Sequence, residues 1–196
     1  MQIDPCLFIS KMVIVVAYVD DYLIFSKKNS KIDELIKSFK ENRDEYNWEM
    51  KIENTVHEFL GIEVTELPDE EFKFTQKGLI EMVLKATDCL NVNPKPTPTR
   101  VDKPLGTDKE GPLLEGKWKY DLVIRMLMYL AANSRPDIAF AVQQCAWFFH
   151  CTKRSHEQAV IWICRYLKGT MNDGLVYKPT KDLGVDLYCN ADFASL

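Results

Sequence analysis

Five of the nine prolines lie between residues 94 and 112, in the segment NVNPKPTPTRVDKPLGTDKEGP, which spans residues 91–112. Proline fixes the backbone angle φ and has no N–H to donate, so this segment cannot form a helix or a central strand. We therefore expect an extended linker over residues 91–117. Residues 1–90 and 118–170 would be the two main domains, with residues 171–196 beginning a third.

The composition is that of a globular protein, because 46% of the 196 residues are hydrophobic and 28% are charged. No apolar run approaches the roughly 18 residues of a membrane span, and MQIDPCLFIS is not a signal peptide. We expect a cytoplasmic or nuclear protein that is neither secreted nor bound to a membrane. The first residues already resemble the middle of a fold, which predicts a fragment of a longer protein.

The six cysteines are widely spaced and form no C-x-x-C pair, so we expect reduced and mostly buried thiols. Cys145, His150, Cys151 and His156 could be interpreted as a zinc set. Their spacing fits no common zinc pattern, and core cysteines with surface histidines are the simpler interpretation.

Hydrophobic periodicity predicts an α+β chain. Residues 7–25 indicate strands with a tight turn at Val19-Asp20-Asp21, and residues 31–46 indicate a helix with apolar residues at helical spacing. We expect strands at residues 48–52, 57–66 and 72–76, and the second of these contains Gly61. Residues 76–90 are typical of a helix. Three helices are expected within residues 119–170, followed by two strands within residues 174–196.

The net charge of −4 is unevenly distributed, since residues 112–178 carry +4 and the remainder carries −8. A basic segment beside an acidic one suits a metal-dependent enzyme that acts on a polyanion. Composition alone does not decide whether the chain is such an enzyme.

Two adjacent carboxylates, Asp20 and Asp21, interrupt the apolar run VVAYVDDYLIF. Aspartate pairs are common in hairpin turns for conformational reasons alone. Here the flanking strands are strongly apolar, and Tyr18 and Val19 are poor turn residues. Neighbouring carboxylates also repel each other unless a cation lies beside them, and oxygen ligands favour Mg²⁺ or Mn²⁺ over zinc. The pair is therefore a candidate metal site.

YVDD between apolar strands resembles the active-site hairpin of reverse transcriptases, and the chain as a whole resembles the reverse transcriptase of copia-type LTR retrotransposons. Seven segments match in order over nearly the whole chain: DPCLF at 4–8, YVDDYLIF at 18–25, FLGIEV at 59–64, QKGLI at 76–80, LMYLA with RPDIAFAV at 127–142, RYLKGT at 165–170 and YCNADFA at 188–194. YxDD alone is a weak motif, but seven ordered matches are specific.

The resemblance implies an RNA-directed DNA polymerase that transfers nucleotides to a primer, with Mg²⁺ (or Mn²⁺) as cofactor. Asp20 would ligate the metal and Asp21 would support the site, while Tyr18 and Val19 would lie under the primer–template and the nucleotide. The partners implied are an RNA or DNA primer–template, deoxynucleotides and the remainder of the pol polyprotein.

The implied fold is a partial reverse-transcriptase palm over residues 1–90, an antiparallel sheet with helices that carries the YVDD hairpin. Residues 118–170 would be a helical thumb or connection, whose positive charge suits a duplex backbone, and residues 171–196 a truncated ribonuclease H-like start. The strand with Phe59, Leu60 and Gly61 would steady the primer terminus, with Gly61 permitting close backbone approach.

Some features depart from the family pattern. The family needs a further aspartate from an earlier segment like DVKTAFLNG, which is absent from these 196 residues together with the nucleotide-gripping fingers. We therefore expect the chain to be inactive alone. In the ribonuclease H remnant, Asn190 replaces the first acid and Asp192 is retained, so ribonuclease H activity is not expected.

Arg125 and Cys151 replace a glycine and a proline of the family pattern. Arg125 could be a solvated surface residue or a phosphate contact, and we favour the surface residue. The aromatic residues of the helical region are expected to be core residues rather than base-stacking residues: Trp118, Trp147, Phe148, Phe149 and Trp162. His57 and His156 are assigned no catalytic role. The alternative is a non-catalytic remnant that only binds nucleic acid or a partner.

Overall fold

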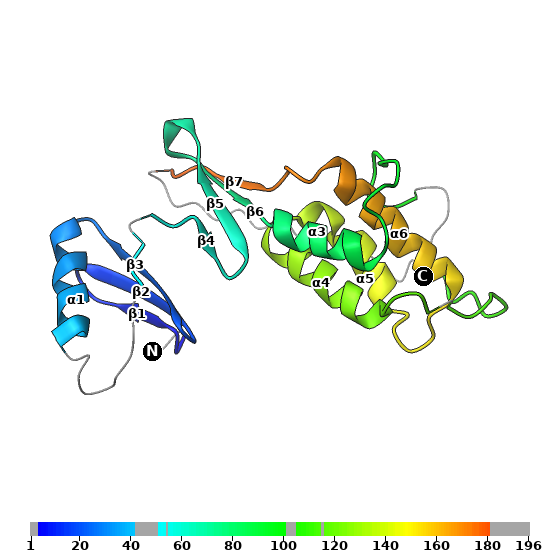
Figure 1. Cartoon of the computed structure of the whole chain (residues 1–196), viewed down its shortest axis with the longest axis horizontal. Coiled ribbons are helices and arrows are strands. Elements are labelled where there is room, and N and C mark those ends of the chain that lie inside the picture. Colours follow the sequence, from blue (N-terminus) through cyan, green and yellow to red (C-terminus); the bar gives the residue numbers. More distant parts are fainter. Residues whose placement is uncertain (1–3, 42–50, 54, 101–104, 115, 181–196) are drawn as a thin grey trace. The chain divides into compact units, whose positions relative to one another are not determined.

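A computed structural model describes residues 4–41, 51–53, 55–100, 105–114 and 116–180. The chain divides into two compact units, Met1–Val56 and His57–Leu196, which we call the first and the second unit (Figure 1). The class is mixed α and β, with antiparallel sheets and five helices among the described residues. The division at residues 56 and 57 differs from the boundary expected at residues 90 and 91.

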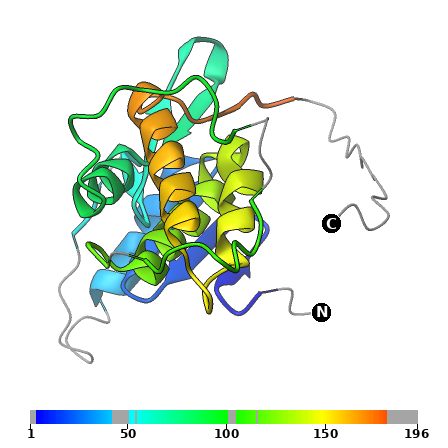
Figure 2. The ribbon, with the colours of Figure 1, turned by 90° about the vertical axis from the view of Figure 1, so that its right-hand side faces the viewer.

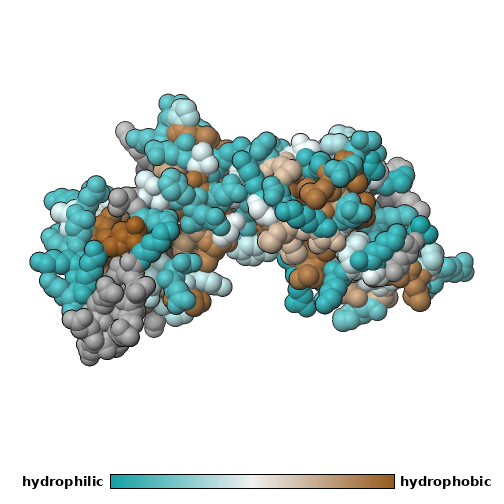
Figure 3. Space-filling view, viewed as in Figure 1, coloured by the Kyte–Doolittle hydropathy of each residue, from teal (hydrophilic) through white to brown (hydrophobic). Residues whose placement is uncertain are grey.

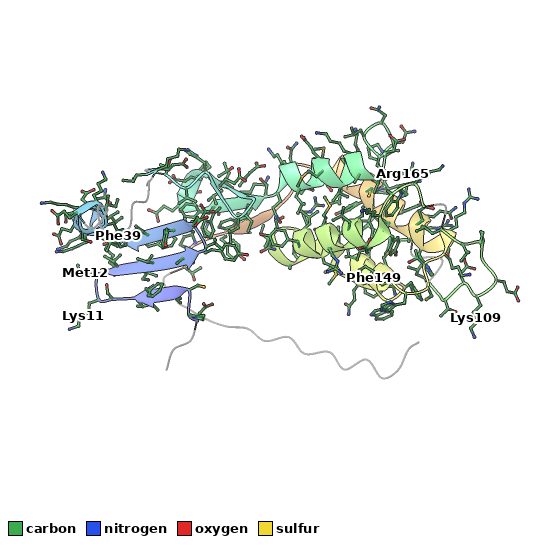
Figure 4. All side chains as sticks on the ribbon, turned by 60° about the horizontal axis from the view of Figure 1, so that its bottom comes forward. Lys11, Met12, Phe39, Lys109, Phe149 and Arg165 are labelled. Atoms are coloured by element: carbon green, nitrogen blue, oxygen red, sulfur yellow. The ribbon has the colours of Figure 1, made fainter. Side chains whose placement is uncertain are left out.

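The first unit contains a three-stranded antiparallel sheet in the order β1-β2-β3, formed by Leu7–Ile9, Val13–Tyr18 and Asp21–Ser26. Lys11 and Met12 lie at the turn between β1 and β2 (Figure 4). The strands and the turn follow the sequence prediction closely, because alternating and β-branched residues favour extended backbone.

Helix α1, Asn29–Glu41, packs against β3. Its apolar stripe is the predicted one, and all four of its members are half-buried: Ile32, Leu35, Ile36 and Phe39. No described residue of the first unit is fully buried, although the sheet is rich in large apolar side chains. Brown surface over this unit is visible in Figure 3. The strand predicted to contain Trp48 and Met50 lies mostly outside the described residues.

The second unit has a four-stranded antiparallel sheet in the order β4-β5-β6-β7. Its strands are Glu58–Phe59, Ile62–Glu66, Phe72–Thr75 and Leu175–Tyr177, and the short 3₁₀ turn η1, Pro68–Glu70, precedes β6. The segment expected to be one strand at residues 57–66 is instead a tight hairpin of β4 and β5.

Strand β7 pairs with β6, so residues expected to begin a separate ribonuclease H-like domain contribute instead to this sheet. The chain enters β7 through Gly174, where a Cβ would lie 2.1 Å from the Phe74 carbonyl oxygen. Phe74 and Tyr177 then pack edge to face at 5.1 Å. Only glycine permits this close approach. Residues 181–196, the rest of the expected domain, lie outside the described residues.

Helices form the rest of the second unit: α3, Lys77–Ala86; α4, Tyr120–Asn133; α5, Ala139–Ala146; and α6, Arg154–Gly169. The short 3₁₀ turn η2, Pro136–Ile138, leads into α5. The three helices expected after the proline-rich segment are therefore present. All four helices supply fully buried residues to one core, among them Ile80, Leu84, Ile124, Leu127, Leu130, Ile163 and Leu167.

Most of the aromatic residues expected in the core do pack against it or are buried: Trp118, Phe148 and Phe149. Trp162 is half-buried, with the Lys95 ammonium 4.4 Å from its ring centroid. Trp147 differs, because 53% of its surface is exposed. Arg125 lies exposed on α4, as expected.

The proline-rich segment is fastened along α6 rather than free between domains (Figure 2). Its backbone carbonyls accept hydrogen bonds from the helix: Arg165 Nε donates to Asn93 (2.7 Å) and Trp162 Nε1 donates to Thr97 (2.9 Å). Gly106, Gly111 and Pro112 also accept, from His156, Lys153 and the backbone of Arg154. In the opposite direction, the Lys95 backbone N–H donates to the Arg165 carbonyl of α6 at 3.2 Å. A segment poor in donors is thus held mainly by donors on one helix.

None of the helices within the described ranges is long and apolar enough to cross a membrane.

Candidate functional site

The hairpin between β2 and β3 carries the predicted carboxylates. Tyr18 pairs directly with Asp21, so Val19 and Asp20 form a two-residue loop. Asp21 is the first residue of β3 and Asp20 is a loop residue, and both are exposed. Cross-strand partners project to the same face of a sheet, which places Tyr18 beside Asp21. The hairpin thus brings all four predicted residues, from Tyr18 to Asp21, to one end of the sheet.

Val19 has a left-handed backbone conformation, with φ of +53°. A positive φ at only the first of two loop residues is the arrangement of a type II′ turn, where glycine is the usual residue. For a β-branched side chain this conformation is strained. The side chain is also 78% exposed, so burial of Val19 does not offset the strain. Strained residues of this kind cluster at functional sites.

The two carboxylates are open to a ligand. Within the described part of the chain, neither the Asp20 nor the Asp21 side chain takes part in a hydrogen bond or an ion pair. Two oxygen donors on a short rigid turn suit a hard divalent cation such as Mg²⁺ or Mn²⁺. They fill only part of the six positions that Mg²⁺ prefers.

Asp4 lies at the same end of the sheet, because Cys6 accepts a hydrogen bond from the backbone of Ala17. Its carboxylate is directed to its own segment, where Oδ1 accepts from the Cys6 backbone at 2.8 Å. Among the described residues, no three acidic, cysteine or histidine side chains converge as a metal site. A metal ion bound at the hairpin would need a further donor besides Asp20 and Asp21.

The second predicted contact region is the turn between β4 and β5. Phe59 pairs with Ile62, and Leu60 and Gly61 form the loop with φ of +53° and +73°. Two positive angles identify a type I′ turn, so Gly61 serves the turn itself. Gly61 was expected inside a strand, and the structure places it in this turn instead. The Leu60 carbonyl accepts a hydrogen bond from the Tyr129 hydroxyl at 2.8 Å, which fixes the turn to α4.

The remaining predicted site residues, Asn190 and Asp192, lie outside the described residues.

His156, to which no catalytic role was assigned, holds the start of α6. Its Nδ1 accepts a hydrogen bond from the Lys153 backbone at 2.9 Å, and its Nε2 donates to the Gly106 carbonyl at 2.8 Å. Phe148 stacks on the ring with 4.1 Å between centroids. A fully buried, capping histidine also corrects the expectation of surface histidines.

The buried guanidinium of Arg135 forms a network that sequence reasoning missed. It binds both Asp137 oxygens at 3.0 and 2.8 Å and also the carbonyl and hydroxyl of Thr170 at 2.8 and 2.7 Å. The Tyr166 hydroxyl donates to Asp137 at 2.7 Å. Burial by itself would raise the pKa of Asp137, but hydrogen bonds from Arg135 and Tyr166 outweigh it and lower the pKa.

Several matched segments therefore contact one another inside the second unit. RPDIAFAV meets RYLKGT through Arg135 and Thr170, and FLGIEV meets LMYLA through Leu60 and Tyr129. The Ser134 hydroxyl, directly before RPDIAFAV, also donates to Gln76 Oε1 of QKGLI at 2.8 Å. These motif residues maintain the fold. A signal was present in the sequence, since Arg and Asp two residues apart can pair across a turn.

Comparison with known proteins identifies relatives of the whole chain. It is 30% identical over 195 residues to the retrovirus-related Pol polyprotein from transposon RE1 of Arabidopsis thaliana, which covers 97% of this chain and 13% of the polyprotein. It is 29% identical to the corresponding polyprotein from transposon TNT 1-94 of Nicotiana tabacum, over 97% of this chain and 15% of that protein. The chain is related to copia-type retrotransposon pol polyproteins.

The pol-related chain spans only about one seventh of the length of these polyproteins. An uncharacterized mitochondrial protein of Arabidopsis thaliana, AtMg00810, is 27% identical over 90% of the chain and 70% of its own length. The same region thus also occurs in a much shorter protein. No protein-family profile and no solved structure matches the pol-related chain.

Proposed function

We propose that this chain is the segment of a copia-type reverse transcriptase that carries the metal-binding hairpin. In this proposal the first unit is part of the palm, α4 to α6 belong to the thumb or connection, and the C-terminal residues approach a ribonuclease H-like domain. The observation that carries it is the rigid hairpin that presents Asp20 and Asp21 at an exposed turn with a strained Val19. The relationship to pol polyproteins supports it.

Asp20 would ligate Mg²⁺ or Mn²⁺, and Asp21 would support the same site. A divalent ion bound there supplies positive charge that stabilises the charge developing during nucleotidyl transfer. The protein's own contribution is orientation, because the apolar strands β2 and β3 hold the turn in one conformation.

Two exposed turns would contact the nucleic acid and the deoxynucleotide. Tyr18 and Val19 are 54% and 78% exposed beside the carboxylates, which leaves them available to a primer–template. The turn at Leu60 and Gly61 would contact the primer terminus, and its hydrogen bond to Tyr129 restricts its movement.

The remainder of the pol polyprotein is the proposed partner of the first unit. Phe8 and Ile9 of the edge strand β1 are 57% and 66% exposed, and no described residue of the unit is fully buried. Exposed apolar patches commonly mark interaction sites. An adjoining polyprotein segment would cover this sheet and supply the further carboxylate, so the chain alone is expected to be inactive.

The test is primer extension by this chain when it is extended upstream through the segment with the further aspartate. We expect Mg²⁺-dependent synthesis that falls at least about 100-fold in Asp20→Asn, because loss of a metal ligand removes transition-state stabilisation. Asp33→Asn, the same change at an exposed carboxylate of α1, is the matched control and should retain full activity. Equal activity in Asp20→Asn and the unaltered protein would refute the site.

A second measurement needs no activity. Mn²⁺ added to the isolated chain should broaden NMR signals of residues 18–22 before those near Asp33, and Asp20→Asn should abolish the difference.

The second candidate is a non-catalytic remnant that only binds nucleic acid or a partner. The specific observation in its favour is that no third metal-binding side chain converges on the hairpin among the described residues. Failure of the extended protein to synthesise DNA, together with retained binding to a primer–template, would favour this candidate.

A further inference from the structure

The proline-rich segment contains the one place in the sequence where a serine or threonine is followed by proline. This residue is Thr97, in the run Thr97-Pro98-Thr99-Arg100. Proline-directed protein kinases select a proline directly after the residue that they phosphorylate. Proline has no N–H that would be left without a partner in an apolar pocket of the kinase. Many of these kinases also favour a basic residue two positions after the proline, where this chain has Arg100.

Thr97 is accessible to an enzyme. It is exposed and lies where the chain bends at residues 96–99, outside the helices and strands. Its hydroxyl donates to the Thr99 carbonyl at 2.9 Å, and its own carbonyl accepts from Trp162 Nε1 at 2.9 Å. A kinase that binds the segment in extended form would open these two contacts without breaking a helix or a sheet. Thr99 differs, because it is half-buried and is followed by arginine.

Two cations meet beside Thr97. The Lys95 ammonium lies 4.4 Å from the centroid of the Trp162 ring, and the Arg100 guanidinium carbon lies 5.7 Å from the same centroid. The Nε1 of this ring binds the Thr97 carbonyl, so the bend brings both cations to the ring that holds Thr97. Residues 91–100 contain no acidic side chain. A phosphate on Thr97, with a charge of about −1.5 to −2, would therefore enter a locally positive environment.

We propose that Thr97 is a phosphorylation site for a proline-directed protein kinase, with Lys95 and Arg100 as the receptor for the phosphate. The Thr97 Oγ attacks the γ-phosphorus of ATP, and a P–O ester bond forms. The bond from this phosphorus to the bridging oxygen of the β-phosphate breaks, and ADP leaves. The hydroxyl proton passes to the catalytic base of the kinase. Charge-assisted hydrogen bonds from the two cations then replace the bond from the Thr97 hydroxyl to Thr99.

The phosphate would change how the proline-rich segment is attached to α6. Lys95 and Arg100 would turn from the Trp162 ring to the phosphate, because a full negative charge attracts a cation more strongly than the face of a ring does. The hydrogen bonds from Trp162 and Arg165 end on backbone carbonyls and can remain. The site belongs to the second unit and uses neither carboxylate of the hairpin, so this inference does not depend on the proposed polymerase function.

The test treats the full chain with a purified cyclin-dependent kinase, which is proline-directed, and with Mg²⁺ and ATP. Mass spectrometry of the digest then maps the phosphate. We expect it on Thr97, and we expect Thr97→Ala and Pro98→Ala to abolish it. Thr99→Ala is the matched control and should leave the modification unchanged, because Thr99 contacts Thr97 only through its backbone carbonyl. An unmodified Thr97, or equal modification in Pro98→Ala, would overturn the proposal.

A second measurement tests the receptor through phosphorus NMR of the phosphorylated chain. The second pKa of a phosphate ester on threonine is about 6 without neighbouring charges. Lys95 and Arg100 should lower this pKa, and Lys95→Met should raise it back toward that value. Lys109→Met removes an exposed lysine of the same segment and should leave the pKa of the phosphate unchanged. Equal pKa values in the unaltered chain and in Lys95→Met would overturn the role of Lys95 in the receptor.

Discussion

Ile124, Leu127 and Leu130 of the second unit have no exposed surface, whereas the equally apolar Ile9 and Phe25 of the first unit are 66% and 48% exposed. The same residue types thus serve a closed core in one unit and an open sheet in the other. Apolar burial is the dominant favourable contribution to folding. We infer that the second unit, which holds the closed core, is the more stable of the two units.

The largest expected effect is on the core of the second unit. Leu127→Ala should lower the free energy of unfolding by about 3 kcal/mol, because it removes buried surface and leaves a cavity. Ile9→Ala should change it by less than about 0.5 kcal/mol, since exposed side chains contribute little. Urea unfolding followed by circular dichroism measures both, and similar losses would remove the contrast between the units.

The second largest loss of stability is expected when the Arg135 network is removed. Arg135→Met keeps the apolar bulk but removes four hydrogen bonds to Asp137 and Thr170. We expect a loss of about 2 kcal/mol in the same unfolding assay, less than for a fully buried ion pair because the Asp137 side chain is 39% exposed and partly screened. Lys85→Met, at an exposed lysine of α3, is a control that should be nearly neutral. A neutral Arg135→Met would mean that the network does not stabilise the unit.

Acid should weaken the second unit through the same network. The pKa of Asp137 is lower in the folded chain, so its contribution to stability is complete above its unfolded pKa near 4 and is lost as the pH falls through the folded value. Unfolding measured from pH 5 to pH 2 should therefore show a smaller decrease in Asp137→Asn than in the unaltered chain. Identical pH profiles would contradict the shift.

The smallest effect is expected at the hairpin. Val19→Gly should stabilise the first unit by roughly 0.5–1 kcal/mol, since relief of the left-handed strain exceeds the added chain entropy. Ala17→Gly, in the adjoining strand, should destabilise it by a similar amount. Hydrogen exchange of the β2 and β3 amides measures both changes. In the extended protein, the looser turn of the Val19→Gly variant should reduce primer extension, and unchanged synthesis would mean that the strain has no part in activity.

Local patterns predicted much of this fold. The β2–β3 hairpin, the apolar stripe of α1 and the three helices after the proline-rich segment follow from short-range periodicity. The type I′ turn at Leu60 and Gly61 was missed because leucine rarely adopts a positive φ, so the usual turn signal was absent. The pairing of β7 with β6 depends on strands about 100 residues apart, which no local window reveals.

The sequence likewise predicted only some of the residues of the candidate site and their contacts. Asp20 and Asp21 could be found because charge interrupts an apolar run, and the structure places both at an exposed turn. The contact of Tyr129 with Leu60 and the bonds from Arg135 to Thr170 could not be found, since each depends on how separate segments pack, whereas the local pairing of Arg135 with Asp137 left a signal in the sequence. The placement of the proline-rich segment along α6 was missed for the same reason.

The way in which α6 holds the proline-rich segment has an evolutionary consequence. Asn93, Thr97 and Gly106 accept through their backbone carbonyls. Their donors are the side chains of Arg165, Trp162 and His156, respectively. Every amino acid offers the same carbonyl, so these three hydrogen bonds tolerate substitutions in the segment, whereas Lys95 contacts the Trp162 ring through its own side chain. Selection for this attachment would act on the helix, and related copies should diverge faster in the segment than in the helix positions that bind it.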